Sequence, residues 1–139
     1  MVRRRQASGA GHVPDDHVRI ARDVLAAKVA DKTGQPANAI TLLEKAVAAQ
    51  DALPYMEPPY WYYPVRQSLG AVCLSAGKAA EAEAVFREDL KRTPRNGWAL
   101  MGLAESLRRQ GKDSAAASVQ REFEAAWTEA DVKPNLSWF

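Results

Sequence analysis

The sequence contains few of the residue types that perform catalysis or bind metals. It has one cysteine, Cys73, and two histidines, His12 and His17, both near one end. One cysteine cannot form a disulfide within the chain, and the two histidines leave the rest of the chain without an imidazole base. The sequence also lacks a glycine-rich phosphate loop, a Cys/His cluster and a nucleophile motif. We therefore expect no enzymatic activity, no metal and no cofactor, and we place Cys73 in the core.

Long apolar runs and an excess of charge are also missing. No segment approaches the ~20 apolar residues of a membrane span, and the basic start MVRRRQASGAGHV lacks the apolar stretch of a secretory signal. Without the three N-terminal arginines, the net charge of +2 becomes 16 basic against 17 acidic residues. A neutral folded part gives no electrostatic footprint for nucleic acid. We expect a cytoplasmic protein with neither membrane nor nucleic acid among its partners.

Regularly spaced glycines indicate a repeat. Gly34, Gly77 and Gly111 are each followed five residues later by an alanine, and the last two glycines are 34 residues apart. Each copy predicts a helix, a glycine turn and a second helix. The predicted organisation is a flexible tail at 1–12, a helical domain at 13–130 with repeats at about 14–53, 63–96 and 97–130, an inserted loop at 51–60, and a C-terminal tail at 131–139.

The apolar residues of each predicted helix recur at steps of three and four, which is typical of one buried face. In the middle repeat they are Val65, Leu69, Val72, Cys73 and Ala76, followed by Ala82, Val85, Phe86 and Leu90. In the first repeat they are Val18, Ala21, Leu25, Ala26 and Val29, followed by Ala39, Leu42, Leu43 and Ala46. Pro36 fits the first turn of its helix, and Pro94 ends the middle repeat's second helix.

The acidic pair Asp15 and Asp16 stands beside His17 at the start of the first repeat. Two carboxylates and an imidazole suggest a metal site, but adjacent residues at a helix start do not converge on one point. Asp15 or Asp16 is better interpreted as the helix cap.

The chain resembles the tetratricopeptide repeat family, whose period is also 34 residues. The middle repeat carries most of the family pattern, in Leu69, Gly70, Gly77, Ala82, Phe86, Leu90 and Pro94. The third departs from the pattern with Gln120 and Thr128, and Arg66 and Leu100 stand where the family has a tryptophan. Block 57–77 also resembles the C-terminal region of longer bacterial proteins of this family without assigned function. The resemblance implies an all-α solenoid of about three antiparallel helix-turn-helix repeats.

A run of aromatic residues, within EPPYWYYP at 57–64, allows two interpretations. Pro64 fits a first turn, so we expect the middle repeat's first helix to begin near residues 60–62. Four consecutive side chains there point all around the helix axis. Either most of the rings pack inside, or at least one of Tyr60, Trp61 and Tyr63 lines a binding surface. A third hypothesis has the 55–64 loop stack on a flat ligand such as a sugar ring.

The resemblance implies that partners bind on a concave face lined by the first helix of each repeat. Near it we place Gln67 from the middle repeat, and Trp98, Met101, Glu105, Arg108 and Arg109 from the third. These residues would clasp an apolar peptide with an acidic end. Alternatively, the two arginines complement the dipole of their own helix. The leading hypothesis is a non-enzymatic module that binds a peptide or protein segment.

The C-terminal end carries apolar side chains that need cover. Phe123 and Trp127 form a stripe on the last predicted helix, and the chain ends in Trp138 and Phe139. No polar capping element follows the third repeat, although a repeat array normally requires one. We expect the tail to fold back onto the repeats or to enter another subunit. The alternative function is self-association, as a homodimer formed through the terminal helices or this tail.

Overall fold

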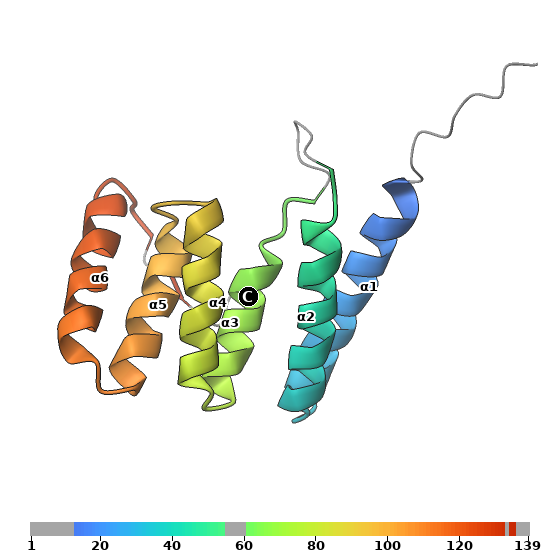
Figure 1. Cartoon of the computed structure of the whole chain (residues 1–139), viewed down its shortest axis with the longest axis horizontal. Coiled ribbons are helices and arrows are strands. Elements are labelled where there is room, and N and C mark those ends of the chain that lie inside the picture. Colours follow the sequence, from blue (N-terminus) through green and yellow to red (C-terminus); the bar gives the residue numbers. More distant parts are fainter. Residues whose placement is uncertain (1–12, 55–60, 133, 136–139) are drawn as a thin grey trace, which may run out of the picture.

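The chain folds into a row of helices, and the computed structural model describes residues 13–54, 61–132 and 134–135, which contain no strand. The helices are α1 (Val13–Lys32), α2 (Pro36–Asp51), α3 (Val65–Ser75), α4 (Ala79–Arg92), α5 (Gly97–Arg109) and α6 (Asp113–Ala126). Each packs against the next in the sequence, and α3 also contacts α5 (Figure 1). No helix in these ranges is long and apolar enough to cross a membrane.

Glycine turns join the helices into antiparallel pairs, as predicted. Gly34, Gly77 and Gly111 have φ angles of 76°, 76° and 71°. Glycine reaches this left-handed region without the steric cost of a Cβ. In the first turn the backbone N–H of Gln35 donates to the carbonyl oxygen of Ala30 at 2.8 Å, which satisfies a carbonyl left over at the end of α1. The equivalent residues of the other two turns make the same bond.

The core between the second and third helix pairs centres on Phe86, which is fully buried. Its ring lies between Gly70 of α3 and Gly102 of α5, where an added Cβ would come within 2.4 Å and 2.2 Å of it. The small residues therefore let both helices approach α4. The predicted inward residues Val65, Leu69, Cys73 and Ala82 are buried, and Val72, Ala76, Val85 and Leu90 are partly so. Burial raises the pKa of the Cys73 thiol to about 11.

The first helix buries a different face from the predicted one. Val18, Leu25 and Val29, predicted to face inward, are 66%, 65% and 56% exposed. The buried apolar residues of α1 are Ile20, Val24, Ala27 and Ala30. Both sets have helical spacing, so periodicity alone does not distinguish them. Among the described helices, α1 is the first of the row and packs against α2 on one side only (Figure 1).

The start of α1 also differs from the prediction. The helix begins at Val13, so Asp15 and Asp16 lie in its first turn and neither is the cap. Their carboxylates there still face the positive end of the helix dipole. In α2, Pro36 does occupy the first turn. The predicted inward residues Ala39, Leu43 and Ala46 are buried, and Leu42 is partly buried.

The third helix starts later than predicted. It begins at Val65, not near residues 60–62, and Pro64 precedes it with φ −80° and ψ 83°. A proline disfavours the helical conformation for the residue before it. Tyr63 is therefore outside the helix, and residues 61–64 form a connecting segment between the first and second helix pairs. At the other end of this pair, α4 stops at Arg92, two residues before Pro94, as expected.

One carboxylate ties the second helix pair to the third. Glu83 of α4 accepts hydrogen bonds of 2.8 Å each from Lys112 Nζ, Arg87 Nε and Gln110 Nε2. Gln110 also donates to the carbonyl oxygen of Ala79 at 3.2 Å. The bonds from Lys112, Arg87 and Gln110 lower the pKa of Glu83 to about 2. Because Gln110 and Lys112 flank the turn at Gly111, this carboxylate fixes that turn against α4.

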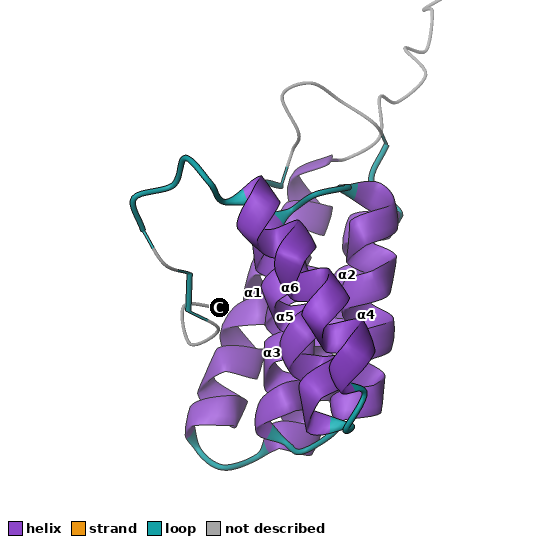
Figure 2. Cartoon of the chain, turned by 90° about the vertical axis from the view of Figure 1, so that its left-hand side faces the viewer, coloured by secondary structure: helices purple, strands orange, loops and turns teal. Residues whose placement is uncertain are grey.

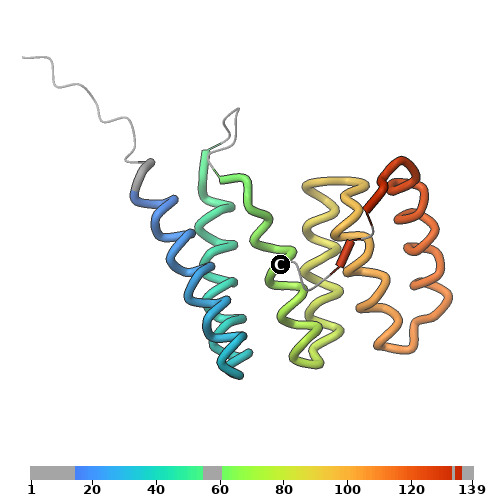
Figure 3. Tube along the Cα trace, turned by 180° about the vertical axis from the view of Figure 1, so that it is seen from behind, coloured from blue at the N-terminus to red at the C-terminus, as the bar shows by residue number. Residues whose placement is uncertain are grey.

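After α6 the chain turns back. The indole Nε1 of Trp127 donates to the carbonyl oxygen of Val132 at 2.5 Å. The described residues of the tail then run along the side of the row on which α1 and α3 lie (Figures 2 and 3). Trp138 and Phe139, predicted to cover the end of the repeats or another subunit, lie outside the described residues.

Candidate functional site

A pocket of about 800 Å³ opens at the edge of the row where α2 and α4 end and α3 and α5 begin. We call it the junction pocket. Its walls come from the ends of α2 and α4, from the connecting segment before α3, from the starts of α3 and α5, and from the turn between α4 and α5. The lining residues are Gln50, Asp51, Tyr62, Tyr63, Pro64, Arg66, Gln67, Asp89, Arg92, Thr93, Asn96 and Trp98. Helix ends from three pairs thus meet around one cavity.

One wall of the junction pocket is an ion-paired cluster. Arg66 donates to both carboxylate oxygens of Asp51, with 2.7 Å between Nη1 and Oδ1. Arg92 Nη2 lies 3.2 Å from Asp51 Oδ2 and its Nε lies 3.8 Å from Glu88 Oε1. The hydrogen bond from Arg66 lowers the pKa of Asp51. Both guanidinium groups of the pocket are therefore already paired, and they connect the ends of α2 and α4 to the start of α3.

A second wall contains a buried carboxylate without a cation. Asp89 is 8% exposed and accepts one side-chain hydrogen bond, from Gln67 Nε2 to its Oδ2 at 3.0 Å. Among the described residues, no lysine or arginine nitrogen lies within ion-pairing distance of it. Burial raises the pKa of Asp89, although the hydrogen bond from Gln67 and the nearby charges of Arg66 and Arg92 act in the opposite direction. Gln67 is itself 2% exposed, and its carbonyl Oε1 has no hydrogen-bond partner.

The orientation of the Gln67 amide follows from this contact. A carboxylate accepts hydrogen bonds and does not donate them when ionised. The amide nitrogen of Gln67 must therefore face Asp89, which turns its carbonyl oxygen elsewhere. From the described residues the Asp89 carboxylate accepts one side-chain hydrogen bond, and the buried Gln67 carbonyl accepts none.

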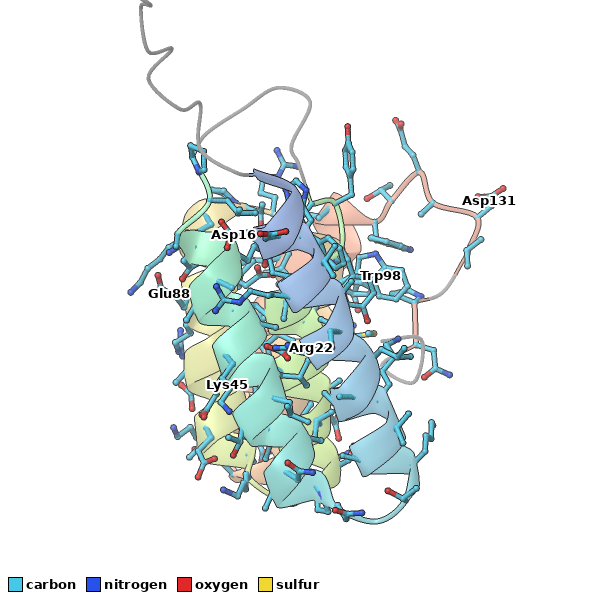
Figure 4. All side chains as sticks on the ribbon, turned by 90° about the vertical axis from the view of Figure 1, so that its right-hand side faces the viewer. Asp16, Arg22, Lys45, Glu88, Trp98 and Asp131 are labelled. Atoms are coloured by element: carbon cyan, nitrogen blue, oxygen red, sulfur yellow. The ribbon has the colours of Figure 1, made fainter. Side chains whose placement is uncertain are left out.

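Aromatic rings border the junction pocket. Tyr62 is 75% exposed. Two contacts fix the side chain of Tyr63. Its hydroxyl lies 2.6 Å from Ser68 Oγ, and the Lys28 ammonium lies 5.2 Å from its ring centroid. Trp98 meets Trp127 edge to face, with 5.7 Å between ring centroids. Figure 4 shows Trp98 on the side of the row that α1 borders, away from Glu88.

Three predicted partner-binding residues, Tyr63, Gln67 and Trp98, come together in the junction pocket. Trp61 does not line it, because its partly buried ring packs against the core. Tyr60 lies outside the described residues. Sequence reasoning placed Gln67 on an open face, whereas the structure buries it in the pocket wall.

The other predicted residues of this set lie on α5, away from the junction pocket. Met101 is half-buried. Glu105 pairs with both arginines, at 2.5 Å to Arg108 Nη1 and 2.7 Å to Arg109 Nε. Arg109 Nη1 also donates to the carbonyl oxygen of Leu74 at 2.8 Å. Arg109 therefore stabilises the C-terminal end of α3, the first helix of the preceding pair, in addition to its place at the end of α5.

The aromatic residues predicted for self-association on α6 pack within the chain. Phe123 and Trp127 stack with 5.8 Å between ring centroids. The Trp127 ring also covers Gly97 at the start of α5, where an added Cβ would come within 2.1 Å of it. The Trp127 ring therefore covers part of the surface of the last helix pair from within the chain.

Sequence reasoning missed the charged residues of the site, which are Asp51, Arg66, Asp89 and Arg92. A signal existed for two of them. Asp89 stands three residues after Phe86, on the apolar face of its helix, and Arg66 stands between buried positions at the start of α3. Charged residues at core positions are rare unless they are paired, so they mark a site to inspect.

Comparison with known proteins adds one relative. The chain is 32% identical over 73 residues to an uncharacterized protein of Aquifex aeolicus (strain VF5). The match covers 51% of this chain and 10% of that protein. The chain therefore spans about a tenth of the length of the relative it matches. No protein-family model matches the chain.

Proposed function

We propose that the chain is a short repeat module of the tetratricopeptide type, and that it binds a segment of another protein at the junction pocket. A lysine or arginine side chain of that segment pairs with Asp89. The three antiparallel helix pairs and their positive-φ glycines support the repeat assignment. The buried carboxylate of Asp89, which has no cation partner among the described residues, carries the functional proposal.

The energetics favour a cationic guest. An ionised carboxylate removed from water loses several kcal/mol unless a cation or enough hydrogen bonds compensate it. For Asp89 the bond from Gln67 and the charges of Arg66 and Arg92, neither of which contacts it directly, compensate only part of this cost, because burial still raises its pKa. An incoming ammonium or guanidinium group would pair with Asp89. An anionic guest would instead have to displace Asp51 from Arg66, at the loss of both of their hydrogen bonds.

The shape of the junction pocket fits the side chain of lysine or arginine. These side chains place a long apolar stem behind a charged head. Tyr62 and Trp98, which line the pocket, offer ring surface to the stem and a π face to the charge. The arginines that sequence reasoning assigned to an acidic peptide end, Arg108 and Arg109, are occupied by Glu105. A basic segment is therefore the better supported partner.

The proposal is tested with blocked amino acids as probes, followed by nuclear magnetic resonance of the isotope-labelled protein. Nα-acetyl-lysine amide and Nα-acetyl-arginine amide are expected to shift the side-chain signals of Gln67 and Trp98. The same lysine probe acetylated on its Nζ, which lacks the charge, should not. A peptide array then identifies basic segments that bind more tightly.

Two variants distinguish binding at Asp89 from a nonspecific attraction between the cationic probe and the negative charges of the protein. Asp89→Asn keeps the shape of the side chain but removes its charge, and should abolish the shifts. Glu122→Gln removes one exposed negative charge from α6, far from the pocket, and should leave them unchanged. Equal shifts in the wild type and Asp89→Asn, or none with either charged probe, would refute the proposal.

A further inference from the structure

The outer face of α1 carries an apolar stripe that no described residue covers. Val18, Leu25 and Val29 are the three most exposed large aliphatic residues among those described. They lie at one end of the helix row (Figure 1), and Arg22, labelled on α1 in Figure 4, lies among them in the sequence. Aliphatic side chains lined up on one helix are typical of a helix-packing surface and differ from scattered exposed residues.

The stripe belongs to a regular series, which we call the α1 seam. It consists of Asp15, Val18, Arg22, Leu25, Val29 and Lys32, at successive steps of three, four, three, four and three residues. This spacing matches the seam along which two helices pack at a shallow angle. The middle of the series holds Val18, Leu25 and Val29 with Arg22 among them, and Asp15 stands at one end and Lys32 at the other.

The α1 seam is complementary to itself when reversed. In an antiparallel pair centred between Arg22 and Leu25, Asp15 faces the partner's Lys32, and Val18 faces the partner's Val29. Arg22 faces the partner's Leu25, whose side chain its aliphatic stem can cover. Each contact occurs twice, as a two-fold interface requires. A parallel pair would instead place Asp15 against Asp15 and Lys32 against Lys32.

We propose that α1 forms a symmetric antiparallel contact with α1 of a second copy of the chain. A groove of about 450 Å³ beside Leu25 and Val29 supports this arrangement. It runs between the outer surfaces of α1 and α2 and is lined mainly by apolar residues, including Ala26 and Leu42. In the antiparallel register, the partner's Val18 lies next to this groove. The contact uses a different surface from the junction pocket and does not depend on the proposed function.

The oligomeric state of the full chain is the first test. Sedimentation equilibrium should give a mass that rises from the monomer value of 15.3 kDa towards the dimer value with increasing concentration. Leu25→Lys places a lysine opposite the partner's Arg22 and should leave a monomer at every concentration. Val132→Lys, at an apolar residue that is also exposed, should dimerise as the wild type does. Circular dichroism checks that both variants keep their helices. A wild type that stays monomeric, or a Leu25→Lys variant that still dimerises, overturns the proposal.

Charge reversal tests the antiparallel register. Asp15→Lys and Lys32→Asp each create two like-charged contacts across the two-fold axis, and each alone should weaken dimerisation by at least about tenfold. An equimolar mixture of the two variants restores opposite charges at both ends, so the mixed dimer should recover wild-type affinity. If both variants dimerise as strongly as the wild type, the antiparallel register is wrong.

Cysteine cross-linking gives an independent check. A mixture of Val18→Cys and Val29→Cys chains should form a disulfide-linked dimer under mild oxidation, while Val18→Cys alone should not. The native Cys73 is buried and does not compete. Cross-linking of Val18→Cys with itself would indicate parallel helices and refute the proposed contact.

Discussion

The outer helix α1 and the central helices α3 to α5 are built from similar repeat patterns but differ in burial. In the centre, Phe86 is enclosed between the glycine positions of two neighbouring helices. In α1, aliphatic residues at comparable helical spacing remain in contact with water. The difference comes from the number of neighbours and not from the sequence pattern. A helix inside the row is covered on two sides, whereas the first helix is covered on one.

The largest expected effect on stability is at Phe86, in the central helices. Phe86→Ala removes a fully buried ring, and its two glycine neighbours have no side chains with which to fill the cavity. We expect the free energy of unfolding to fall by about 3–5 kcal/mol. Urea denaturation followed by circular dichroism measures this loss. A change below about 1 kcal/mol would show that the helices collapse around the missing ring.

An intermediate effect is expected at Glu83, which joins α4 to the last turn. Its pKa of about 2 lies below the ordinary value of 4.5, so its stabilising contribution is complete above pH 4.5 and disappears as the pH falls through 2. Glu83→Gln should lower stability by about 1 kcal/mol at pH 7. The difference from the wild type should vanish near pH 2. Unfolding measured across this range tests the prediction, and a constant difference at every pH would contradict it.

The smallest effect is expected on α1. Leu25→Ala removes an exposed side chain, and the free energy of unfolding of the monomer should change by less than about 0.5 kcal/mol. The measurement must be made at a protein concentration low enough to keep the chain monomeric, because dimerisation stabilises the folded state. A loss comparable to that of Phe86→Ala would mean that α1 buries this residue in the monomer and would remove the contrast between the two regions.

The all-helical fold and its glycine turns could be predicted from the sequence because their signals are local. Glycine is the residue that reaches positive φ at low cost, so Gly34, Gly77 and Gly111 mark the turns directly. The buried face of α3 and α4 follows from a single apolar stripe on each helix. In α1 two apolar stripes compete, and the choice between Ile20 and Val18 depends on where α2 packs, which the local sequence does not contain.

The junction pocket was only partly predictable for a similar reason. Tyr63 was a candidate because it belongs to the aromatic run, and Gln67 and Trp98 were candidates because the family resemblance places them near the concave face. The pairing of Arg66 with Asp51 spans the segment 51–64, and Asp89 becomes a buried acceptor only when Gln67 is brought against it. These are long-range contacts, and the spacing of residues within one helix does not reveal them.

The position of Phe86 also has a consequence for how the chain unfolds. One side chain serves as core for two helix pairs, so neither pair can open without exposing it. Helices α3, α4 and α5 should therefore lose their amide protection against hydrogen exchange in a single cooperative event. Helices α1 and α2 themselves contain no phenylalanine, tyrosine or tryptophan, and their amides should exchange through openings of lower free energy. In this row of helices, the unit of cooperativity is thus set by the position of one large residue and not by the boundaries of the helix pairs.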